Sequence, residues 1–318
     1  MGSVVLPQPK EKSVPLSNPA FLAARPAPFI QLTASVRRIL APNPSPMTFW
    51  GTNTYMIGTG AVAVIDPGPK DDKHLQAILD ALSPGETISH IFVTHAHLDH
   101  SALAPALSRA TGAPVLAFGS AEAGRSARMQ ALARSLALTG GEGVDRAFQP
   151  DRCLTDGEVI TANTWALEAI HTPGHMANHL CFASGDTLFS ADHVMGWASS
   201  LVSPPDGDMG DYIASLRRLS QREWGRALPG HGAPIEAPSS RIAALLTHRS
   251  EREAAILSAL VEAPALIPNL VERLYSDTPR SLFPAAARNV FAHLLQLHAE
   301  GRVTATPDAT PDALYQTA

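Results

Sequence analysis

The stretch Thr94-His95-Ala96-His97-Leu98-Asp99-His100 decides how this 318-residue chain is interpreted. It follows an apolar, strand-like run over residues 88–93, which places three imidazoles and a carboxylate where a strand ends. Side chains two positions apart in a strand share a face, so His95 and His97 would point the same way. A turn into a helix at Ser101 would direct the last two residues of the stretch to a neighbouring position. Neutral imidazole and carboxylate suit zinc and related ions, so the stretch predicts two metal positions a few ångströms apart.

Four further segments carry histidine or aspartate beside glycine or after an apolar run. They are VAVIDPG over 62–68, HTPGH over 171–175, LFSAD over 188–192 and LPGHG over 228–232. Taken in this order with the central stretch, the segments resemble the motifs of the metallo-β-lactamase superfamily, and the resemblance covers roughly residues 45 to 305.

This resemblance implies a dinuclear metal site. The first ion would be held by His95, His97 and His175, the second by Asp99, His100 and His231, and Asp192 would bridge both. Asp66 would orient a ligand without binding an ion itself. The cofactors would be two divalent ions per chain, zinc before manganese or iron, because the ligand types do not settle the metal. A water between the ions would lose a proton near neutral pH and attack the substrate, with Asp99 and Asp192 as the catalytic carboxylates.

Local sequence supports several of these positions. A glycine before His175 permits a tight turn that presents the imidazole, and His231 stands between two glycines. Asp192 ends an apolar strand, where an unpaired carboxylate would be costly and a metal would offset the cost. An alternative interpretation of Asp66 is a simple turn residue before Pro67-Gly68. Many relatives have glycine at the position of Ala191, so we expect a slight shift of the bridging aspartate.

Alternating strand and helix patterns predict an α/β fold, an αββα sandwich of the metallo-β-lactamase type, over residues 30–240. A Pro-rich arm over residues 1–29 precedes it. Residues 241–318 resemble the small helical, winged-helix-like domain of a superfamily branch that includes endoribonucleases and uncharacterised bacterial hydrolases. Helices are expected over 101–111 and 121–138, and the insertion over 121–148 either caps the site or extends a surface helix.

Composition narrows the partners. A net charge of −5 gives no general attraction to nucleic acid or anionic membrane, and 6% aromatic residues leave few platforms for stacking bases. Between Arg249 and Arg302 six arginines are balanced by six acidic residues, so DNA binding is not expected and RNA is disfavoured. No run is long enough for a membrane helix, and no secretory signal is evident, which favours the cytoplasm. Cys153 and Cys181 are expected to be free thiols.

The loop over 194–211 follows the bridging aspartate, so it is expected to form one wall of the pocket. Met195 and Trp197 would supply an apolar patch there, unless they simply pack beneath the loop. The three aspartates of this loop are interpreted as solvated turn and helix-cap residues; they are Asp206, Asp208 and Asp211.

The leading hypothesis is therefore a metal-dependent hydrolase of a small acyl substrate: a lactone, thioester, ester or β-lactam. An endoribonuclease or phosphodiesterase is the first alternative, which the branch resemblance favours and the charge balance opposes. A non-catalytic metal-binding module is the second. A homodimer is compatible with the long loop and the C-terminal helices.

Overall fold

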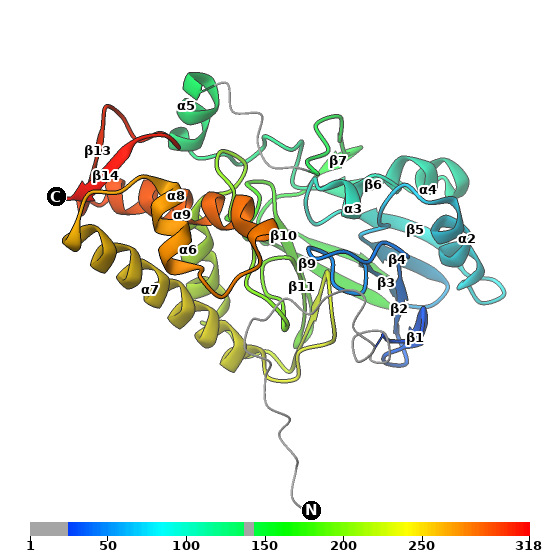
Figure 1. Cartoon of the computed structure of the whole chain (residues 1–318). Helices are drawn as coiled ribbons and strands as arrows, with labels where there is room; N and C mark the ends of the chain where they lie inside the picture. Colours follow the sequence, from blue (N-terminus) through cyan, green and yellow to red (C-terminus); the bar gives the residue numbers. More distant parts are fainter. Residues whose placement is uncertain (1–24, 137–142) are drawn as a thin grey trace, which may run out of the picture.

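The computed structural model describes residues 25–136 and 143–318 of the chain (Figure 1). Almost all of the expected Pro-rich arm, and the end of the expected 121–138 helix, lie outside these residues. Two sheets form the centre of the fold and helices cover their outer faces.

The first sheet has seven strands in chain order. They are β1 (Phe29–Gln31), β2 (Val36–Leu40), β3 (Asn53–Ile57), β4 (Ala61–Ile65), β5 (Thr87–Phe92), β6 (Val115–Ala117) and β7 (Arg152–Cys153). Strands β1 to β4 pair antiparallel, and β4 to β7 pair parallel. Parallel neighbours end at one edge of the sheet, and the chain leaves β5 there with the His95–His100 segment.

The second sheet has the order β12-β11-β10-β9-β8. Its strands are β8 (Val159–Ala162), β9 (Trp165–His171), β10 (Leu180–Ser184), β11 (Thr187–Ala191) and β12 (Arg226–Pro229). Strands β11 and β12 run parallel, so the segments that follow them, with Asp192 and His231, leave the same edge.

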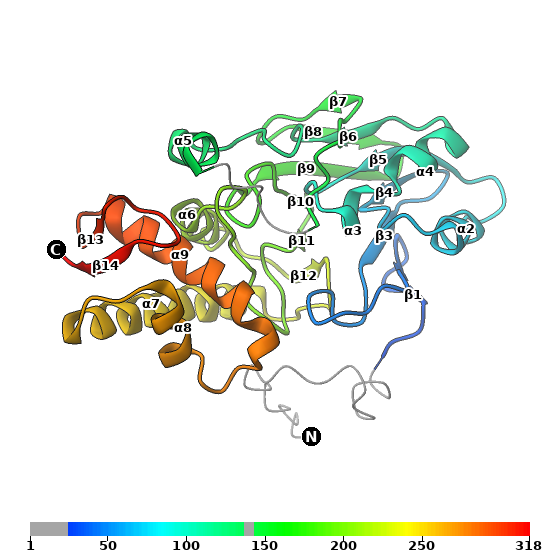
Figure 2. The ribbon, with the colours of Figure 1, turned by 45° about the horizontal axis from the view of Figure 1, so that its top comes forward.

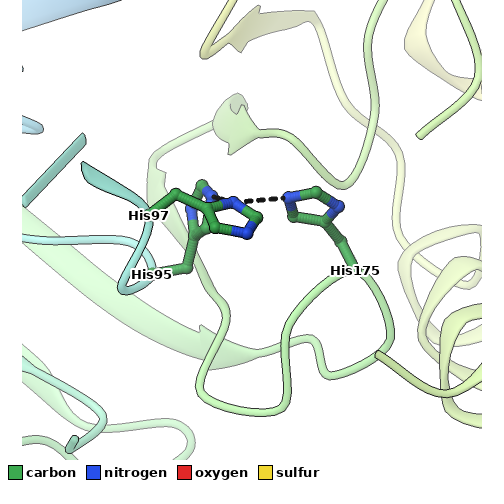
Figure 3. Close-up of side chains that lie close together, drawn as sticks. All are labelled: His95, His97 and His175. Atoms are coloured by element: carbon green, nitrogen blue, oxygen red, sulfur yellow. Dashed lines mark hydrogen bonds between the residues drawn. The ribbon is translucent and has the colours of Figure 1, made fainter. Parts of the chain in front are cut away.

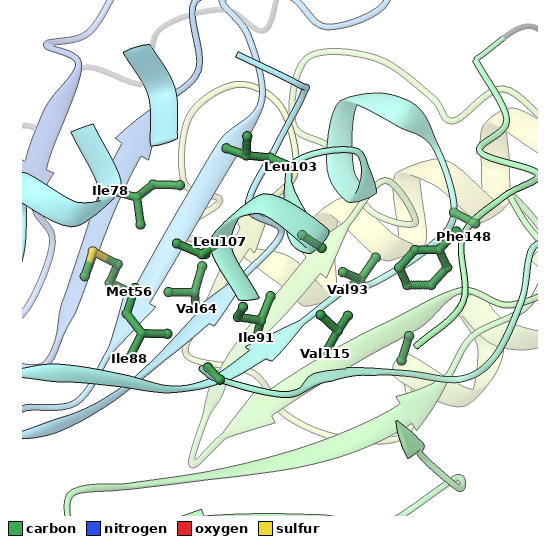
Figure 4. Packing of buried hydrophobic residues seen from close by; sticks show 14 of the residues in the cluster. Met56, Val64, Ile78, Ile88, Ile91, Val93, Leu103, Leu107, Val115 and Phe148 are labelled. Carbon is green, nitrogen blue, oxygen red and sulfur yellow. The ribbon is translucent and has the colours of Figure 1, made fainter. Parts of the chain in front are cut away.

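Successive side chains along each strand point to opposite faces of the sheet and so pack into different layers of the fold. In β4, Val62 and Val64 face the helices α2 (Asp72–Asp80) and α4 (Ala104–Thr111), while Ala63 and Ile65 face the second sheet. Figure 4 shows the outer cluster, in which Ile78 and Leu107 pack onto these strands. On the far side, α6 (Met209–Leu219) and α7 (Pro238–Glu262) cover the second sheet. The expected αββα sandwich is confirmed.

The C-terminal elements gather at one end of the molecule (Figure 2), and a separate hydrophobic core holds them together. These are the end of α7 with α8 (Ile267–Leu274), the 3₁₀ turn η1 (Arg280–Leu282), α9 (Phe283–Ala299), β13 (Val303–Thr306) and β14 (Leu314–Thr317). The wing is a two-stranded antiparallel hairpin. The exact boundary between the domains, set at residue 240 from the sequence, stays a prediction, since α7 packs against both cores.

Helix α5 (Ala127–Leu136) begins six residues later than the sequence suggested. Its Met129 and Leu132 belong to the C-terminal core, so the helix is neither a surface extension nor, in its described part, a cap over the site. Downstream, Gly143 accepts a hydrogen bond from Leu98 N (2.7 Å) and Asp145 N donates to Ala96 O (2.8 Å). The insertion therefore connects the C-terminal core to the histidine loop.

Two of the three aspartates in the 194–211 loop are buried and not solvated, which corrects that expectation for them. Asp206 and Asp208 are buried, and each pairs with an arginine ahead of or within α5: Arg125 with Asp206 and Arg128 with Asp208, both at 2.5 Å. The partners lie about 80 positions away, which local sequence patterns do not reveal. The cap itself is confirmed, because Asp208 accepts from Gly210 N at the start of α6.

We expect Arg125→Ala to destabilise the protein by about 3–5 kcal/mol, because it removes the guanidinium from a buried ion pair with Asp206. The two side chains are only 6% and 2% exposed. Arg226→Ala is the matched control: its pair with Glu236 is 32% and 66% exposed and contributes at most about 1 kcal/mol. Urea unfolding of both variants checks this, and equal losses would contradict a special role for the buried pair.

Candidate metal centre

The central histidine stretch is a loop followed by a short helix. Strand β5 ends at Phe92, so His95 is not the strand-borne residue that the sequence suggested. Asp99 and His100 lie inside helix α3 (Leu98–Ser101), and the expected helix over 101–111 is divided into α3 and α4. The loop still brings the imidazoles together because neighbouring chain segments hold its backbone.

His95, His97 and His175 meet at one point (Figure 3). Their ring nitrogens face one another: His95 Nε2 lies 2.9 Å from His97 Nδ1, and His175 Nε2 lies 3.1 Å from the same nitrogen. The first two come from the loop after β5, and the third comes from the loop between β9 and β10.

A second group joins Asp99, His100 and His231. His100 Nε2 is 3.3 Å from His231 Nε2, and Asp99 Oδ2 is 3.3 Å from His231 Nε2 and 3.5 Å from His100 Nε2. Asp99 keeps 27% of its side chain exposed, whereas both imidazoles are buried. The carboxylate is thus the open side of this group.

Asp192 stands between the two groups. Its Oδ2 lies 3.7 Å from His175 Nε2 and 3.4 Å from His231 Nε2, and its Oδ1 lies 3.6 Å from His100 Nε2. The buried Oδ1 has no hydrogen-bond partner within the residues that the structure describes. A buried carboxylate oxygen in this condition is costly, and a cation would remove the cost.

Electrostatics agree with cation binding. Burial holds the pKa of His95 well below its usual value and lowers that of His97 to about 3, so both imidazoles are neutral, which is the form that binds metal. For His231, burial opposes the positive charge, but Asp192 and Asp99 together outweigh it and raise the pKa to about 10. The two carboxylates therefore create a field that favours positive charge, and the donor set fits divalent ions.

The ring nitrogens that face away from the centre also have oxygen neighbours. His95 Nδ1 lies 2.9 Å from Thr94 Oγ1, His175 Nδ1 lies 2.6 Å from Leu201 O, and His231 Nδ1 lies 3.2 Å from Gly51 O. Such contacts fix ring orientation and leave the inner nitrogens as ligands.

Asp66 supplies the corresponding contact for His100. Its Oδ2 is 2.8 Å from His100 Nδ1, and the carboxylate also accepts from Thr94 N and Thr94 Oγ1, both at 2.8 Å. The carboxylate is almost fully buried and lies in neither metal-sized group. This placement suits an orienting residue better than a simple turn residue.

Three polar residues in or just before β3 contact the centre: two hold the last ligand loop, one contacts Asp99, and the sequence pattern did not single them out. Asn53 donates from Nδ2 to Pro229 O (3.0 Å) and Gly232 O (2.9 Å), Tyr55 donates to Pro229 O (2.7 Å), and Thr52 donates to Asp99 (3.3 Å). The sequence signal for these positioning residues is three polar side chains at the start of a buried strand.

The other histidines in the described ranges lie outside these ligand groups. His171 stacks on Phe118 with 3.7 Å between ring centroids. His193, next to Asp192, lies beside Tyr212 (4.7 Å) and His179 (5.7 Å).

Of the two expected pocket residues, Met195 is 5% exposed and so packs beneath its loop. Trp197 is partly exposed and stacks on Phe49.

Ala191 stands at a position where the backbone conformation matters, since its φ is +42°. This left-handed conformation costs an alanine about 1 kcal/mol relative to glycine. We therefore expect Ala191→Gly to stabilise the metal-free protein by up to about 1 kcal/mol, measured by urea unfolding in the presence of a chelator. A loss of stability in this variant would show that the backbone conformation of Ala191 is not strained.

Comparisons with known proteins agree with this structure. The metallo-β-lactamase superfamily profile matches residues 47–231, and the β-lactamase-associated winged-helix profile matches residues 267–312. The chain is 32% identical to a β-lactamase-like protein 2 homologue of Drosophila melanogaster, over 88% of this chain and 93% of that protein. It is 30% identical to an atrochrysone carboxyl ACP thioesterase of Paecilomyces divaricatus, over 71% and 65%.

Among solved structures, a β-lactamase domain protein from Burkholderia ambifaria superposes with a TM-score of 0.77 at 22% identity, covering 93% of this chain and 96% of that one. This likeness shows the fold. No helix in the described ranges combines the length and apolar character needed to cross a membrane. From the profile match and the relatives, the chain belongs to the metallo-β-lactamase superfamily and is a hydrolase of that superfamily, with a C-terminal winged-helix domain.

Proposed function

We propose that the protein is a dinuclear metal-dependent hydrolase of a small acyl substrate, with a thioester ranked before a lactone, ester or β-lactam. The observation that carries this is the position of Asp192, whose oxygens lie within 3.7 Å of imidazoles from both ligand groups. The thioesterase named among the relatives supports placing thioesters first.

In this proposal one ion is held by His95, His97 and His175, the other by Asp99, His100 and His231, and Asp192 is shared. Zinc suits the set, and manganese and iron use the same ligand types. Bound ions would supply an activated water and polarise the substrate carbonyl. The chain itself supplies a rigid frame, with Asp66 holding His100 and Asn53 holding the loop of His231.

Asp99 is the ligand carboxylate that a substrate can approach, since its side chain is 27% exposed. Burial would raise its pKa, but the neighbouring His100 and His231 lower it, so the carboxylate is ionised near neutral pH. An ionised Asp99 can accept a proton and pass it to the departing thiolate or alkoxide. Thr52, which donates to this carboxylate at 3.3 Å, fixes its direction.

The winged-helix domain is the one specific support for the endoribonuclease alternative, but four of the six arginines between residues 249 and 302 are buried or already engaged. Arg249 is 2% exposed, and Arg252 lies over the ring of Tyr275 at 4.1 Å. Arg273 and Arg302 pair with Glu262 and Glu253. A polyanion such as RNA would have to displace these contacts, so we rank nucleic acid cleavage second.

The test combines elemental analysis of the purified protein with initial rates on thioester, lactone, ester, β-lactam, phosphodiester and RNA substrates. We expect about two divalent ions per chain and turnover confined to acyl substrates. RNA cleavage without turnover of acyl substrates would favour the endoribonuclease alternative. Absence of ions, together with unchanged rates after chelation, would reject the metal mechanism.

A further inference from the structure

Three consecutive residues in the loop between β11 and α6, segment 200–202, contact two of the proposed metal ligands. Leu201 O accepts a hydrogen bond from His175 Nδ1 at 2.6 Å, and Figure 3 shows that one ring nitrogen of His175 points away from the other two labelled imidazoles. Ser200 Oγ donates to the backbone carbonyl of Asp192. The segment therefore fixes both the ring of His175 and the backbone that carries the shared carboxylate.

The C-terminal helices hold the same segment from the other side. Asn289 of α9 accepts from Val202 N through Oδ1 at 3.0 Å, and Arg249 of α7 donates from Nη2 to Ser200 O. Both loop residues are fully buried, and Val202 lies in one hydrophobic cluster with residues of α7 and α9. The two contacts thus stand on either side of Leu201, whose carbonyl orients the ligand imidazole.

Arg249 is an unusual side chain to bury for packing alone. It is 2% exposed, and its guanidinium lies over the ring of Tyr212 at 5.0 Å. Its Nε has no hydrogen-bond partner within the residues that the structure describes. A buried cation with an unsatisfied N–H group is costly. The fold keeps this cost in order to place a donor at Ser200 O.

Arg252, one turn further along α7, makes the same two kinds of contact away from the metal centre. It donates to Leu274 O at 3.0 Å and lies over the ring of Tyr275 at 4.1 Å. Both partners stand at the end of α8. Arg252 therefore offers a control of matched chemistry for Arg249.

We propose that Asn289 and Arg249 are positioning residues of the metal centre. Through segment 200–202 they fix the ring of His175 and the backbone of Asp192. The C-terminal domain is then part of the frame that gives the metal ligands their geometry. Loss of a contact behind a metal ligand commonly weakens metal binding by about 10- to 100-fold. This inference rests on the proposed function, because it assigns ions to these two ligands.

The first experiment needs no metal and follows the His175 ring by NMR of the imidazole nitrogens in the metal-free protein. The bond to Leu201 O requires a proton on Nδ1, so wild type should show that tautomer. Asn289→Ala and Arg249→Met should give a mixture of tautomers, because each releases one end of the segment. Asn289→Asp keeps an acceptor oxygen for Val202 N and should retain the wild-type tautomer. An unchanged ring in Asn289→Ala and Arg249→Met would overturn the proposal.

The second experiment measures zinc affinity by competition with a chelator. Asn289→Ala and Arg249→Met should each weaken zinc binding by about tenfold or more, whereas Asn289→Asp and Arg252→Met should bind zinc like wild type. Methionine keeps much of the arginine volume and removes the buried charge, so Arg249→Met is expected to fold. Thermal melts of the metal-free variants check this. A merely structural role would lower the melting temperature without changing zinc affinity.

The two experiments separate failure of this inference from failure of the proposed function. Equal zinc affinities in Arg249→Met and Arg252→Met would overturn the role of Arg249, and wild-type affinity in Asn289→Ala would overturn that of Asn289. If wild type binds no zinc, the proposed function fails. The tautomer of His175 in the same variants then still decides whether the C-terminal helices position this ring.

Discussion

Asp192→Asn is expected to reduce metal content and to lower the hydrolytic rate by on the order of a thousandfold, about 4 kcal/mol of transition-state stabilisation. The substitution keeps the shape of the side chain and removes its charge. Asp192 lies close to His100, His175 and His231, so the charge acts on both proposed ion positions. No other carboxylate in the described part of the centre does this, because Asp99 lies only in the second group.

The measurement is metal content by elemental analysis beside kcat/KM on the best substrate from the panel. Asp186→Asn is the matched control, since it makes the same change at an exposed aspartate on the same hairpin. A thermal melt of each metal-free variant separates loss of ligation from loss of fold. Full metal content and wild-type rates in Asp192→Asn would show that Asp192 does not bridge two ions.

The sequence was sufficient for the features that a few adjacent residues encode. Each segment with a proposed ligand carries its own signal, such as glycines on both sides of His231 or an apolar strand before Asp192. Alternation in strands such as β4 likewise specified two buried faces, which is enough for a layered sandwich. Local pattern and fold agree there because one physical cause, burial of alternate side chains, produces both.

What the sequence could not supply are contacts between distant segments. Asn53 is recognisable as a positioning residue only when Pro229 and Gly232, more than 170 positions away, are brought to it. The sequence suggested a solvated Asp206 because its partner, Arg125, comes from a distant segment just before α5. Hydrophobic periodicity carries no information on which loop meets which, since those pairings are decided by the packing of the sheets.

Gly230→Ala is expected to impair the centre without altering any ligand. A Cβ at this position would lie 2.4 Å from Asp192 Oδ1 and 2.8 Å from His100 Cε1, distances that Cβ atoms essentially never show. The loop cannot easily retreat, because Gly230 N donates to Ala191 O (2.9 Å) and Gly230 O accepts from Asn53 N (2.7 Å). The methyl must therefore displace the Asp192 carboxylate or the His100 ring, and overpacking of this kind costs about 1–3 kcal/mol of stability.

The decisive measurement for Gly230→Ala is metal affinity by competition with a chelator, and we expect a loss of about 10- to 100-fold, as for disturbed neighbours of metal ligands. Gly60→Ala serves as the control for lost stability alone: its φ of +73° makes alanine unfavourable by about 1 kcal/mol, yet no atom lies within 4 Å of the added methyl. If both variants bind metal like wild type, Asp192 does not need its present position. If only Gly230→Ala weakens binding, the positions of Asp192 and His100, apart from their chemical identity, determine metal affinity, because this variant keeps every proposed ligand.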